Sequence, residues 1–421
     1  MIRTVILLLF SVIITTASAQ WEPNYDEAKV PQFKLPNPLK TFSGKKIRNV
    51  KNWEKKRRPE LLDYFAENIY GKIPDKLKIS GYDILEESEN ALGGKAIRKQ
   101  VELTFEKNSR TLHFTILIYL PKSNEKVPVF LGYNFLGNHT VCEDANILIS
   151  TAWVANNPSL GIVNHQLTEQ SRGVRTDRWA IREMLAAGFG FATIYYGEID
   201  PDKNDMTDGV QSLFYIDDQL QPADDEWGSI AAWAWGLSRA LDYFEGDDDV
   251  DESKVVVFGH SRLGKTALWA GASDQRFAGV ISNDSGCGGA ALFKREFGET
   301  IWRINRSFPY WFCDNFKNFN HDEKKLIVDQ HELIALIAPR PVYVASAEED
   351  QWADPKGEFL AAYYAGPVYK LYGIEGIPED VQPPVNKPIL NTVAYHIRSG
   401  GHDVTAFDWK QYINWAQIYI Q

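Results

Sequence analysis

Cysteine is scarce in this sequence, because its 421 residues contain only Cys142, Cys287 and Cys313. Three cysteines leave at least one thiol without a partner in the chain, so they support neither a disulfide scaffold nor a zinc site. A bridge from Cys142 to either of the others stays open, since spacing alone does not decide it. Internal repeats are also lacking, which argues against a fibrous repeat protein.

Positive charge is in deficit as well. The chain has 45 basic and 56 acidic residues, which gives a formal net charge of −11. This balance argues against a protein that holds nucleic acid or an anionic membrane by bulk charge. A neutral or sugar-like partner fits the composition better, and no nucleic acid is expected among the partners.

Long apolar runs are missing except at the start of the chain. Arg3, the apolar stretch 5–14 and the small residues Ala17-Ser18-Ala19 predict a secretory signal peptide over residues 1–19. No later run reaches the roughly 20 apolar residues that span a bilayer. We therefore expect an exported protein, periplasmic or secreted, without stable membrane insertion.

The rest of the composition is that of a globular protein, with 44% hydrophobic and 13% aromatic residues. Residues 20–58 are rich in proline, lysine and asparagine and lack periodicity, which predicts an extended arm that wraps the domain. Residues 59–421 are predicted to form a single catalytic domain. Within it, residues 140–176 have the character of an inserted loop that shapes a cleft.

Strand and helix patterns alternate along this domain. Apolar periodicity predicts a first helix from residue 61, and strands follow at 96–105, 111–120 and 127–131. Helical segments are expected at 180–187, 227–244, 263–272 and 330–337, followed by strands at 190–196, 254–258, 278–282 and 341–345. A last strand at 392–397 precedes a closing helix at 406–420. This order predicts an α/β fold, in which a mostly parallel central sheet lies between helices and ligands bind beyond the carboxyl ends of the strands.

Gly259-His260-Ser261 joins a buried strand to a helix. This is the layout of a nucleophile elbow, in which a strained turn exposes the serine hydroxyl at a helix amino terminus. Leu263 stands where the second glycine of the usual pattern lies, and Gly264 follows. A helix-capping serine is the alternative, but the position of the turn, at the fifth of six or so expected parallel strands, favours the elbow.

A serine nucleophile needs a base, and the base needs a carboxylate to orient it. His402 lies in a glycine-containing loop after the last strand, which favours it as the base. His396 falls inside a strand pattern and is interpreted as a packing residue, whereas His260 beside the serine is expected to support the elbow. For the acid, Asp350 follows the strand 341–345 and Asp284 follows the strand 278–282, and either could face one imidazole, although such aspartates also bond turn backbones.

At this point the sequence resembles the glucuronoyl esterases, carbohydrate esterase family fifteen of the α/β-hydrolase superfamily, and especially their exported bacterial members. The likeness extends over roughly residues 50–420. The stretches that carry it are Gly259-His260-Ser261-Arg262-Leu263-Gly264-Lys265-Thr266-Ala267, Ser285-Gly286-Cys287-Gly288-Gly289-Ala290, Ala338-Pro339-Arg340-Pro341, Trp352-Ala353-Asp354-Pro355 and Tyr395-His396-Ile397-Arg398.

The resemblance implies hydrolysis of the ester between a (4-O-methyl)glucuronoyl branch of xylan and a lignin alcohol, by acyl-enzyme chemistry without metal or cofactor. It implies Ser261 as nucleophile, His402 as base and Arg262 as a contributor to the oxyanion hole. It further implies that three residues grip the uronate ring and its hydroxyls, namely Lys265, Glu299 and Trp352. Many relatives have glutamate at the position of Asp284, so the choice between Asp284 and Asp350 stays open.

Each of these residues also has an ordinary structural role open to it. Arg262 and Lys265 can be charges on a solvated helix, Trp352 can be core, and Glu299 can cap a turn. An acetyl-xylan or general carbohydrate esterase on the same fold is the enzymatic alternative. A catalytically silent glycan-binding protein is the alternative from another class, and in each case a monomer is expected.

Overall fold

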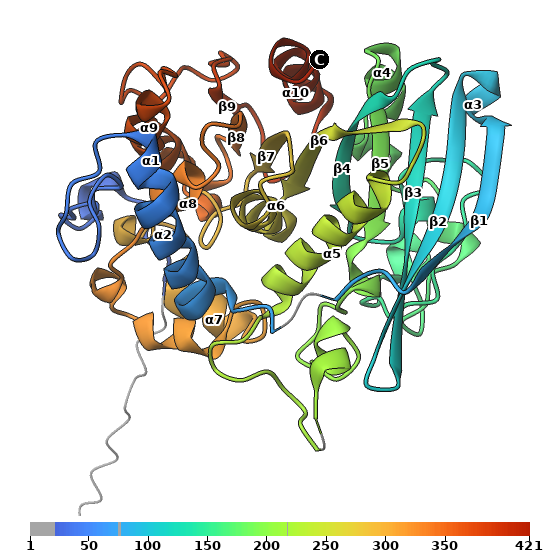
Figure 1. Cartoon of the computed structure of the whole chain (residues 1–421), viewed down its shortest axis with the longest axis horizontal. Coiled ribbons are helices and arrows are strands. Elements are labelled where there is room, and N and C mark those ends of the chain that lie inside the picture. The colour runs from blue at the N-terminus through green and yellow to red at the C-terminus, as the bar shows by residue number, and fades with distance from the viewer. Residues whose placement is uncertain (1–21, 75–76, 217) are drawn as a thin grey trace, which may run out of the picture.

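The computed structural model describes residues 22–74, 77–216 and 218–421, and these form a nine-stranded sheet (Figure 1). The strand order is β1-β2-β3-β5-β4-β6-β7-β8-β9, and in Figure 1 it runs from β9 on the left to β1 on the right. Six neighbouring strands are parallel, namely β5, β4, β6, β7, β8 and β9. The strands β1, β2 and β3 pair antiparallel at one edge. The predicted α/β class with a mostly parallel sheet is confirmed.

The strands are β1 (Gly81–Asn90), β2 (Ala96–Lys107), β3 (Arg110–Pro121), β4 (Val127–Asn134), β5 (Gly190–Tyr195), β6 (Val250–His260), β7 (Gly279–Asn283), β8 (Val342–Ala347) and β9 (Val393–Arg398). The helices are α1 (Val50–Asn52), α2 (Arg58–Phe65), α3 (Ala91–Gly94), α4 (Ile181–Ala186), α5 (Ser229–Phe244), α6 (Arg262–Ser273), α7 (Ile301–Ser307), α8 (Gln330–Ala335), α9 (Pro355–Leu371) and α10 (Ala406–Tyr419). All the strands expected from the sequence are present.

Helices cover both faces of the sheet because its central strands are apolar on both sides. In β6, Val255 and Val257 belong to the core beneath α5, α6, α8 and α9. Val256 and Phe258, which alternate with them, belong to the opposite core beneath α4 and α10. This alternation is the period of two that a strand imposes on its side chains.

The serine turn follows the third parallel strand in chain order, β6, and not the fifth as the sequence indicated. Two of the expected strands, β2 and β3, form an antiparallel hairpin instead of joining the parallel set. Their connection, Asn108 and Ser109, has positive φ at both residues, 52° and 60°. Such a tight turn between neighbouring strands permits antiparallel pairing alone.

The N-terminal helix begins at Val50, within the segment 20–58 that the composition predicted to be extended. It continues through two π-helical turns and α2 to Tyr70. Asn49 caps it by accepting a hydrogen bond from the backbone of Asn52 at 2.9 Å, and Trp53 is fully buried. Tertiary burial of Trp53, which sequence periodicity did not register, thus extends the helix into the predicted arm.

The remaining expectations concern the signal peptide, the disulfides and membrane-spanning helices. The predicted signal peptide, residues 1–19, lies outside the described residues. Cys142, Cys287 and Cys313 are all free, so the bridge that spacing left open does not form. Among the described residues, no helix has the length and apolar character needed to cross a membrane.

Candidate active site

Ser261 lies at the tip of a sharp turn between β6 and α6, with φ 58° and ψ −129°. Its backbone N–H donates to the carbonyl of Asn283, at the end of the neighbouring strand β7, at 2.9 Å. A Cβ atom on Gly259 would lie 1.8 Å from the carbonyl oxygen of Leu263, so the turn requires glycine there. These features define a nucleophile elbow, and its strained backbone holds the serine hydroxyl away from the sheet.

The departure from the usual elbow pattern has a packing explanation. Leu263 is 1% exposed and its side chain belongs to the core beneath α6. The helix approaches the loop after β7 most closely one residue later, where a Cβ atom on Gly264 would lie 2.9 Å from the Cβ atom of Ser285. Gly264 therefore lets the helix pack against the loop after β7.

His402 and Asp350 meet at the carboxyl edge of the sheet. Asp350 follows β8 and His402 follows β9, and these strands are parallel neighbours. Oδ2 of Asp350 lies 2.6 Å from Nδ1 of His402. The Asp350 side chain is 6% exposed and that of His402 is 43% exposed, so a sheltered carboxylate holds an accessible imidazole.

Asp284 lies in the same cluster. One oxygen of each carboxylate and one nitrogen of His402 all lie within 4.8 Å of one another. Oδ2 of Asp284 is 3.4 Å from Nη2 of Arg398, whereas its buried Oδ1 has no hydrogen-bond partner. Burial, followed by the charges of Glu358 and Asp350, raises the pKa of Asp284 well above its ordinary value. Both predicted acids therefore lie near His402, and Asp350 is the one that forms a hydrogen bond with it.

Two carboxylates and an imidazole at this spacing are also donors that a divalent cation accepts. However, Nδ1 of His402 is already engaged by Asp350, and the Arg398 guanidinium supplies positive charge beside Asp284. This donor set therefore fits a hydrogen-bonded acid and base better than a metal site.

His260 packs against His402, with the ring centroids 4.5 Å apart. Its Nδ1 lies 2.6 Å from Oδ1 of Asn283, whose amide nitrogen in turn donates to Tyr412 at 2.9 Å. Burial, with the charges of His402 and Arg178, lowers the pKa of His260 well below its ordinary value. His260 is therefore a neutral ring that packs against the His402 ring.

Arg398 contacts the residues around His402, and sequence reasoning did not select it, although it lies in one of the quoted motifs. Its guanidinium donates to the backbone carbonyls of Gly401 at 3.0 Å and Asp403 at 2.5 Å. These are the residues on either side of His402. Arg398 also donates to Asp408 at 2.8 Å, which fixes the loop to the start of α10.

Arg262 is the first residue of α6, and its guanidinium forms an ion pair with Asp202. It lies over the ring of Trp311, at 4.9 Å from the ring centroid. Its buried Nε has no hydrogen-bond partner among the described residues. Burial by itself would lower the pKa of Arg262, but the charge and hydrogen bond of Asp202, together with Tyr196 and Tyr310, raise it above its ordinary value.

Asp202 also escaped the sequence analysis, because no local pattern links it to a residue 60 positions away. Its side chain is 8% exposed. Besides Arg262, it accepts hydrogen bonds from Tyr196 at 2.9 Å, Tyr310 at 2.8 Å and the indole of Trp311 at 2.8 Å. Asp202 is thus a fixed anion that orients the Arg262 guanidinium.

A second group consists of Lys265, which lies one helical turn after Ser261, and of Glu299 and Trp352, which come from other segments. Nζ of Lys265 donates to the carbonyls of Ser285 at 2.7 Å and Cys287 at 2.6 Å, and it lies 3.6 Å from Oε2 of Glu299. Burial raises the pKa of Glu299, while the charge of Lys265 and hydrogen bonds from Lys265 and Trp352 act in the opposite direction. The structure therefore brings these three predicted residues together.

The segment 132–139 lies on the other side of the elbow. The ring of Phe135 is 5.6 Å from the Arg262 guanidinium and 6.2 Å from the His260 ring. His139 is buried, with Nε2 at 2.7 Å from Oγ of Ser171 in the 140–176 loop. Burial lowers the pKa of His139 to about 4, so this ring is a neutral structural contact.

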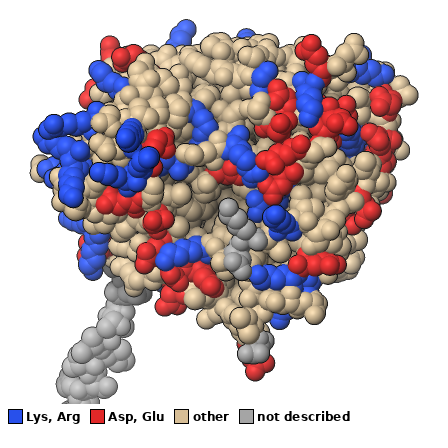
Figure 2. Space-filling model, viewed as in Figure 1, with Lys and Arg blue, Asp and Glu red and all other residues tan. Residues whose placement is uncertain are grey.

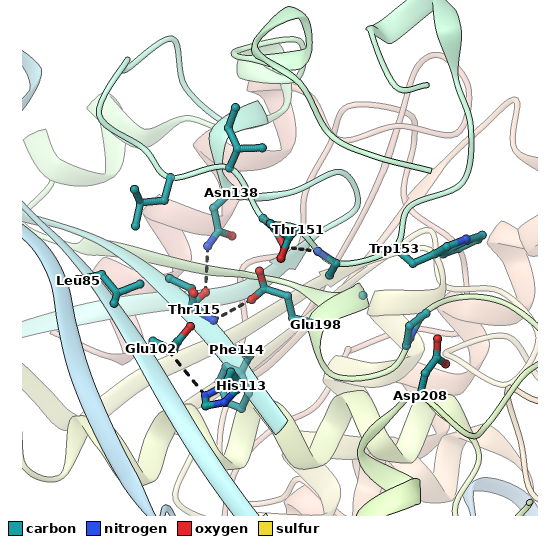
Figure 3. Close-up of a pocket in the computed structure, with 16 residues that line it drawn as sticks. Leu85, Glu102, His113, Phe114, Thr115, Asn138, Thr151, Trp153, Glu198 and Asp208 are labelled. Carbon is teal, nitrogen blue, oxygen red and sulfur yellow. Dashed lines mark hydrogen bonds and ion pairs between the residues drawn. The ribbon is translucent and has the colours of Figure 1, made fainter. Parts of the chain in front are cut away.

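A separate cavity of about 460 Å³ lies between the antiparallel strands and the segments 148–153 and 197–208 (Figure 3). Figure 3 shows Glu198 projecting toward its centre, where the carboxylate accepts a hydrogen bond from the Thr115 backbone at 2.7 Å. Burial raises the pKa of Glu198 to about 7. None of the eight candidate site residues lines this cavity, so it is distinct from the serine site.

Comparisons with known proteins show the family of this chain. A family model described as "Glucuronyl esterase, fungi" matches residues 180–373. Carbohydrate esterase MZ0003, from an unknown prokaryotic organism, is 50% identical over 99% of this chain and 98% of its own length. The structure of a promiscuous CE15 esterase from a marine bacterial metagenome has a TM-score of 0.89 and 51% identity, and the match covers 94% of this chain and 100% of that one. The glucuronoyl esterase of Solibacter usitatus has a TM-score of 0.88 and 44% identity, with the same coverage.

A nucleophile elbow at the carboxyl edge of a mostly parallel sheet defines an α/β-hydrolase, here a carboxylic ester hydrolase. Identity of 50% over 98% of a carbohydrate esterase carries the assignment one step further. The chain belongs to carbohydrate esterase family 15, the glucuronoyl esterases.

Proposed function

We propose that this protein hydrolyses the ester between (4-O-methyl)glucuronoyl side chains of xylan and lignin alcohols. The observation that carries the proposal is the polar group Lys265, Glu299 and Trp352, whose lysine lies one helical turn after the elbow serine. An ammonium, a carboxylate and a flat aromatic ring are complementary to the hydroxyls and the apolar face of a pyranose. The membership of family 15 supports the same substrate class.

The reaction begins with Ser261 as nucleophile and His402 as base. Asp350 accepts a hydrogen bond from Nδ1 of His402, so Nε2 is the nitrogen that takes the hydroxyl proton. Oγ of Ser261 then bonds to the ester carbonyl carbon, and a tetrahedral intermediate forms. When the bond to the alcohol oxygen breaks, His402 returns the proton to the leaving alcohol, and an acyl-enzyme remains.

Hydrolysis of the acyl-enzyme repeats these steps with water. His402 removes a proton from the water, and the oxygen attacks the acyl carbon. The bond to Oγ breaks as the proton passes from His402 to Ser261. The products are the uronic acid and the free alcohol, and the enzyme returns to its starting state.

Arg262 supplies electrostatic stabilisation of the intermediate. Negative charge develops on the carbonyl oxygen during attack, and a donor that is already oriented stabilises it without reorganisation. The buried Nε of Arg262 has an unused hydrogen, and its ion pair with Asp202 fixes the plane of the guanidinium. The second donor is expected from a backbone amide in the segment 132–139, which follows β4, where hydrolases of this fold place one.

Three further properties are proposed with this function. The sequence of residues 1–19 supports export to the periplasm or the medium. The protein is proposed to act as a monomer and to use no metal or cofactor, since the serine chemistry is complete with side chains alone.

The test is release of alcohol from methyl and benzyl glucuronate by purified protein. Wild type is expected to turn over both esters, and Ser261→Ala is expected to lose at least about a thousand-fold in kcat. Acetylated xylan is the matched comparison, because a structural relative is described as promiscuous. Faster turnover of acetylated xylan than of the glucuronate esters would favour a general carbohydrate esterase, and binding without turnover would favour a silent glycan-binding protein.

A further inference from the structure

The segment from Lys34 to Lys56 carries a concentration of positive charge that contrasts with the acidic character of the whole chain. Its basic side chains are all exposed, and its one acidic residue, Glu54, is half-buried. We name as the basic patch the residues Lys34, Lys40, Lys45, Lys46, Arg48, Lys51, Lys55 and Lys56. Figure 2 shows basic side chains gathered at the left of the molecule, where Figure 1 places α1.

The charge of the protein is therefore distributed asymmetrically. Removing these eight cations and Glu54 from the 45 basic and 56 acidic residues leaves 37 basic against 55 acidic residues elsewhere. The net charge of −11 thus conceals a segment that is strongly positive. Local asymmetry of this kind, and not the bulk charge, governs where a charged partner contacts a protein.

The cations of the basic patch are not neutralised by neighbours. The ion pairs nearest to it along the chain join Lys29 to Asp26 and Arg57 to Glu60 and Glu332. None of the patch residues forms an ion pair with another residue in the described part of the chain. Their charges therefore act on the solvent and on whatever approaches from it.

The patch is carried by a fixed scaffold. Lys40 and Lys46 face each other across a short antiparallel bridge. Ile47, which follows, is buried, and its backbone N–H donates to Leu39 at 2.8 Å. The remaining cations follow on the helix that begins at Val50. These contacts hold the backbone in place while the side chains remain free to adapt.

Like charges in such an arrangement destabilise the folded state. Lys51 and Lys55 are four residues apart on the helix and lie on the same face, where equal charges repel. Lys40 and Lys46 are brought together by their bridge. Glu54, the one acid in the segment, is bonded to the Tyr372 hydroxyl and forms no ion pair with a patch residue in the described chain. A repulsion that is not offset by ion pairs is expected where the charge serves binding.

We propose that the basic patch binds the polymer that carries the substrate, through the free uronate carboxylates of that acidic glycan. The choice of glycan rests on the proposed function. Carboxylates spaced irregularly along a flexible chain suit compact ammonium groups on flexible stems, which need no shaped pocket. Each ester that is hydrolysed leaves one more carboxylate on the glycan, so the reaction strengthens the attachment of the enzyme to its own product.

Duplex nucleic acid and anionic bilayers are other polyanions. Both would present a broad charged surface to the protein, and the acidic excess outside the patch opposes such broad contact. A single flexible glycan chain can follow the patch without touching the acidic remainder. This difference makes the glycan the favoured occupant.

The direct test measures binding to glucuronoxylan from which the esters have been removed, with the inactive Ser261→Ala protein as parent. A fourfold variant removes exposed cations from the patch: Lys45→Gln, Lys46→Gln, Lys51→Gln and Lys55→Gln. A control variant makes the same change of charge at exposed lysines elsewhere: Lys122→Gln, Lys324→Gln, Lys370→Gln and Lys410→Gln. At about 20 mM salt, where screening is weak, the patch variant is expected to lose about ten-fold in affinity and the control less than about two-fold.

The outcomes separate the proposal from its alternatives. Raising the salt to about 300 mM should abolish the difference between the patch variant and its parent, because screening weakens exposed charges. Equal losses in the patch and control variants, or no loss in either, would overturn the proposal. It would also be overturned if duplex DNA or phosphatidylglycerol vesicles bound more tightly than glucuronoxylan at equal concentrations of charge.

Kinetics of the active enzyme give an independent readout. The patch variant should raise KM for polymeric glucuronoxylan esters about ten-fold and leave kcat and KM for methyl glucuronate within about two-fold, because the monomer cannot span the surface. An equal change with both substrates would contradict the proposal. Failure of wild type to hydrolyse methyl glucuronate would instead refute the proposed function, and the binding experiment, which uses inactive protein, would still report on the patch.

Discussion

Nδ1 of His402 lies 2.6 Å from Oδ2 of Asp350, whereas Asp284, an equal candidate in the sequence, lies within 4.8 Å of the same ring without a hydrogen bond to it. The hydrogen bond engages one ring nitrogen of His402 and leaves Nε2 to exchange protons with the serine. Asp284 instead faces Arg398, which also holds the loop around His402. The two aspartates thus have different surroundings, and different consequences are expected from replacing them.

Asp350→Asn is expected to lower kcat for methyl glucuronate by roughly a thousand-fold or more, because an amide cannot hold the imidazole in the required tautomer. Asp284→Asn is expected to cost about ten-fold or less, since its nearest cation is Arg398. Single-turnover kinetics of both variants would measure this. Near-normal kcat for Asp350→Asn, with a large loss for Asp284→Asn, would reverse the assignment.

Asp202→Asn is expected to lower kcat about ten-fold with little change in KM. The substitution keeps the shape of the side chain but removes the charge that orients Arg262. Asp205→Asn, three residues away and 43% exposed, is the matched control and should leave kcat unchanged.

A double-mutant cycle tests whether Asp202 acts through Arg262. In an Arg262→Met background, Asp202→Asn should cause no further loss of kcat, because the oriented group is already absent. Additive losses, or a fall in melting temperature without a fall in kcat, would show that Asp202 is merely structural.

Lys265→Met is expected to raise KM for methyl glucuronate about ten-fold, because it removes the proposed donor to the sugar from a buried position. Turnover of an aryl acetate, which has no sugar ring, should stay within about three-fold of wild type. Equal losses on both esters would indicate damage to the elbow rather than loss of a substrate contact. A melting curve is the needed control, since Lys265 also donates to two backbone carbonyls.

Glu358 gives a pH dependence of stability. Its buried carboxylate accepts hydrogen bonds from Ser285, Gly286 and Ser346, and burial raises its pKa from 4.5 to about 8. Between these two values the folded state holds a proton that the unfolded chain has lost, so this group makes the free energy of unfolding fall as pH rises. Below about pH 4.5 and above about pH 8 its contribution no longer changes.

Glu358→Gln mimics the protonated side chain and removes this titration. The melting temperature of the variant relative to wild type should therefore rise steadily from pH 5 to pH 8. Glu125→Gln, at an exposed position, should give a curve parallel to wild type. A constant difference for Glu358→Gln over this range would refute the expected titration.

The elements of the core could be predicted because burial imposes a period on the sequence. The strand at 254–258 and the helix after Ser261 were predicted from their apolar patterns and confirmed. Strand β1 was missed because most of it is exposed and polar at the sheet edge. The start of the N-terminal helix was missed because it depends on the burial of Trp53 in the core, which no local pattern shows.

The sequence by itself determined the parallel sheet, the elbow at Ser261 and the loop position of His402, because each depends on residues that are neighbours in the chain. Tertiary structure alone decided which acid bonds the imidazole, that Asp202 holds Arg262, and that Arg398 clamps the His402 loop. These contacts join separate strand ends and loops. The distances between these side chains follow from the order of the strands in the sheet, and no local pattern of residues specifies that order.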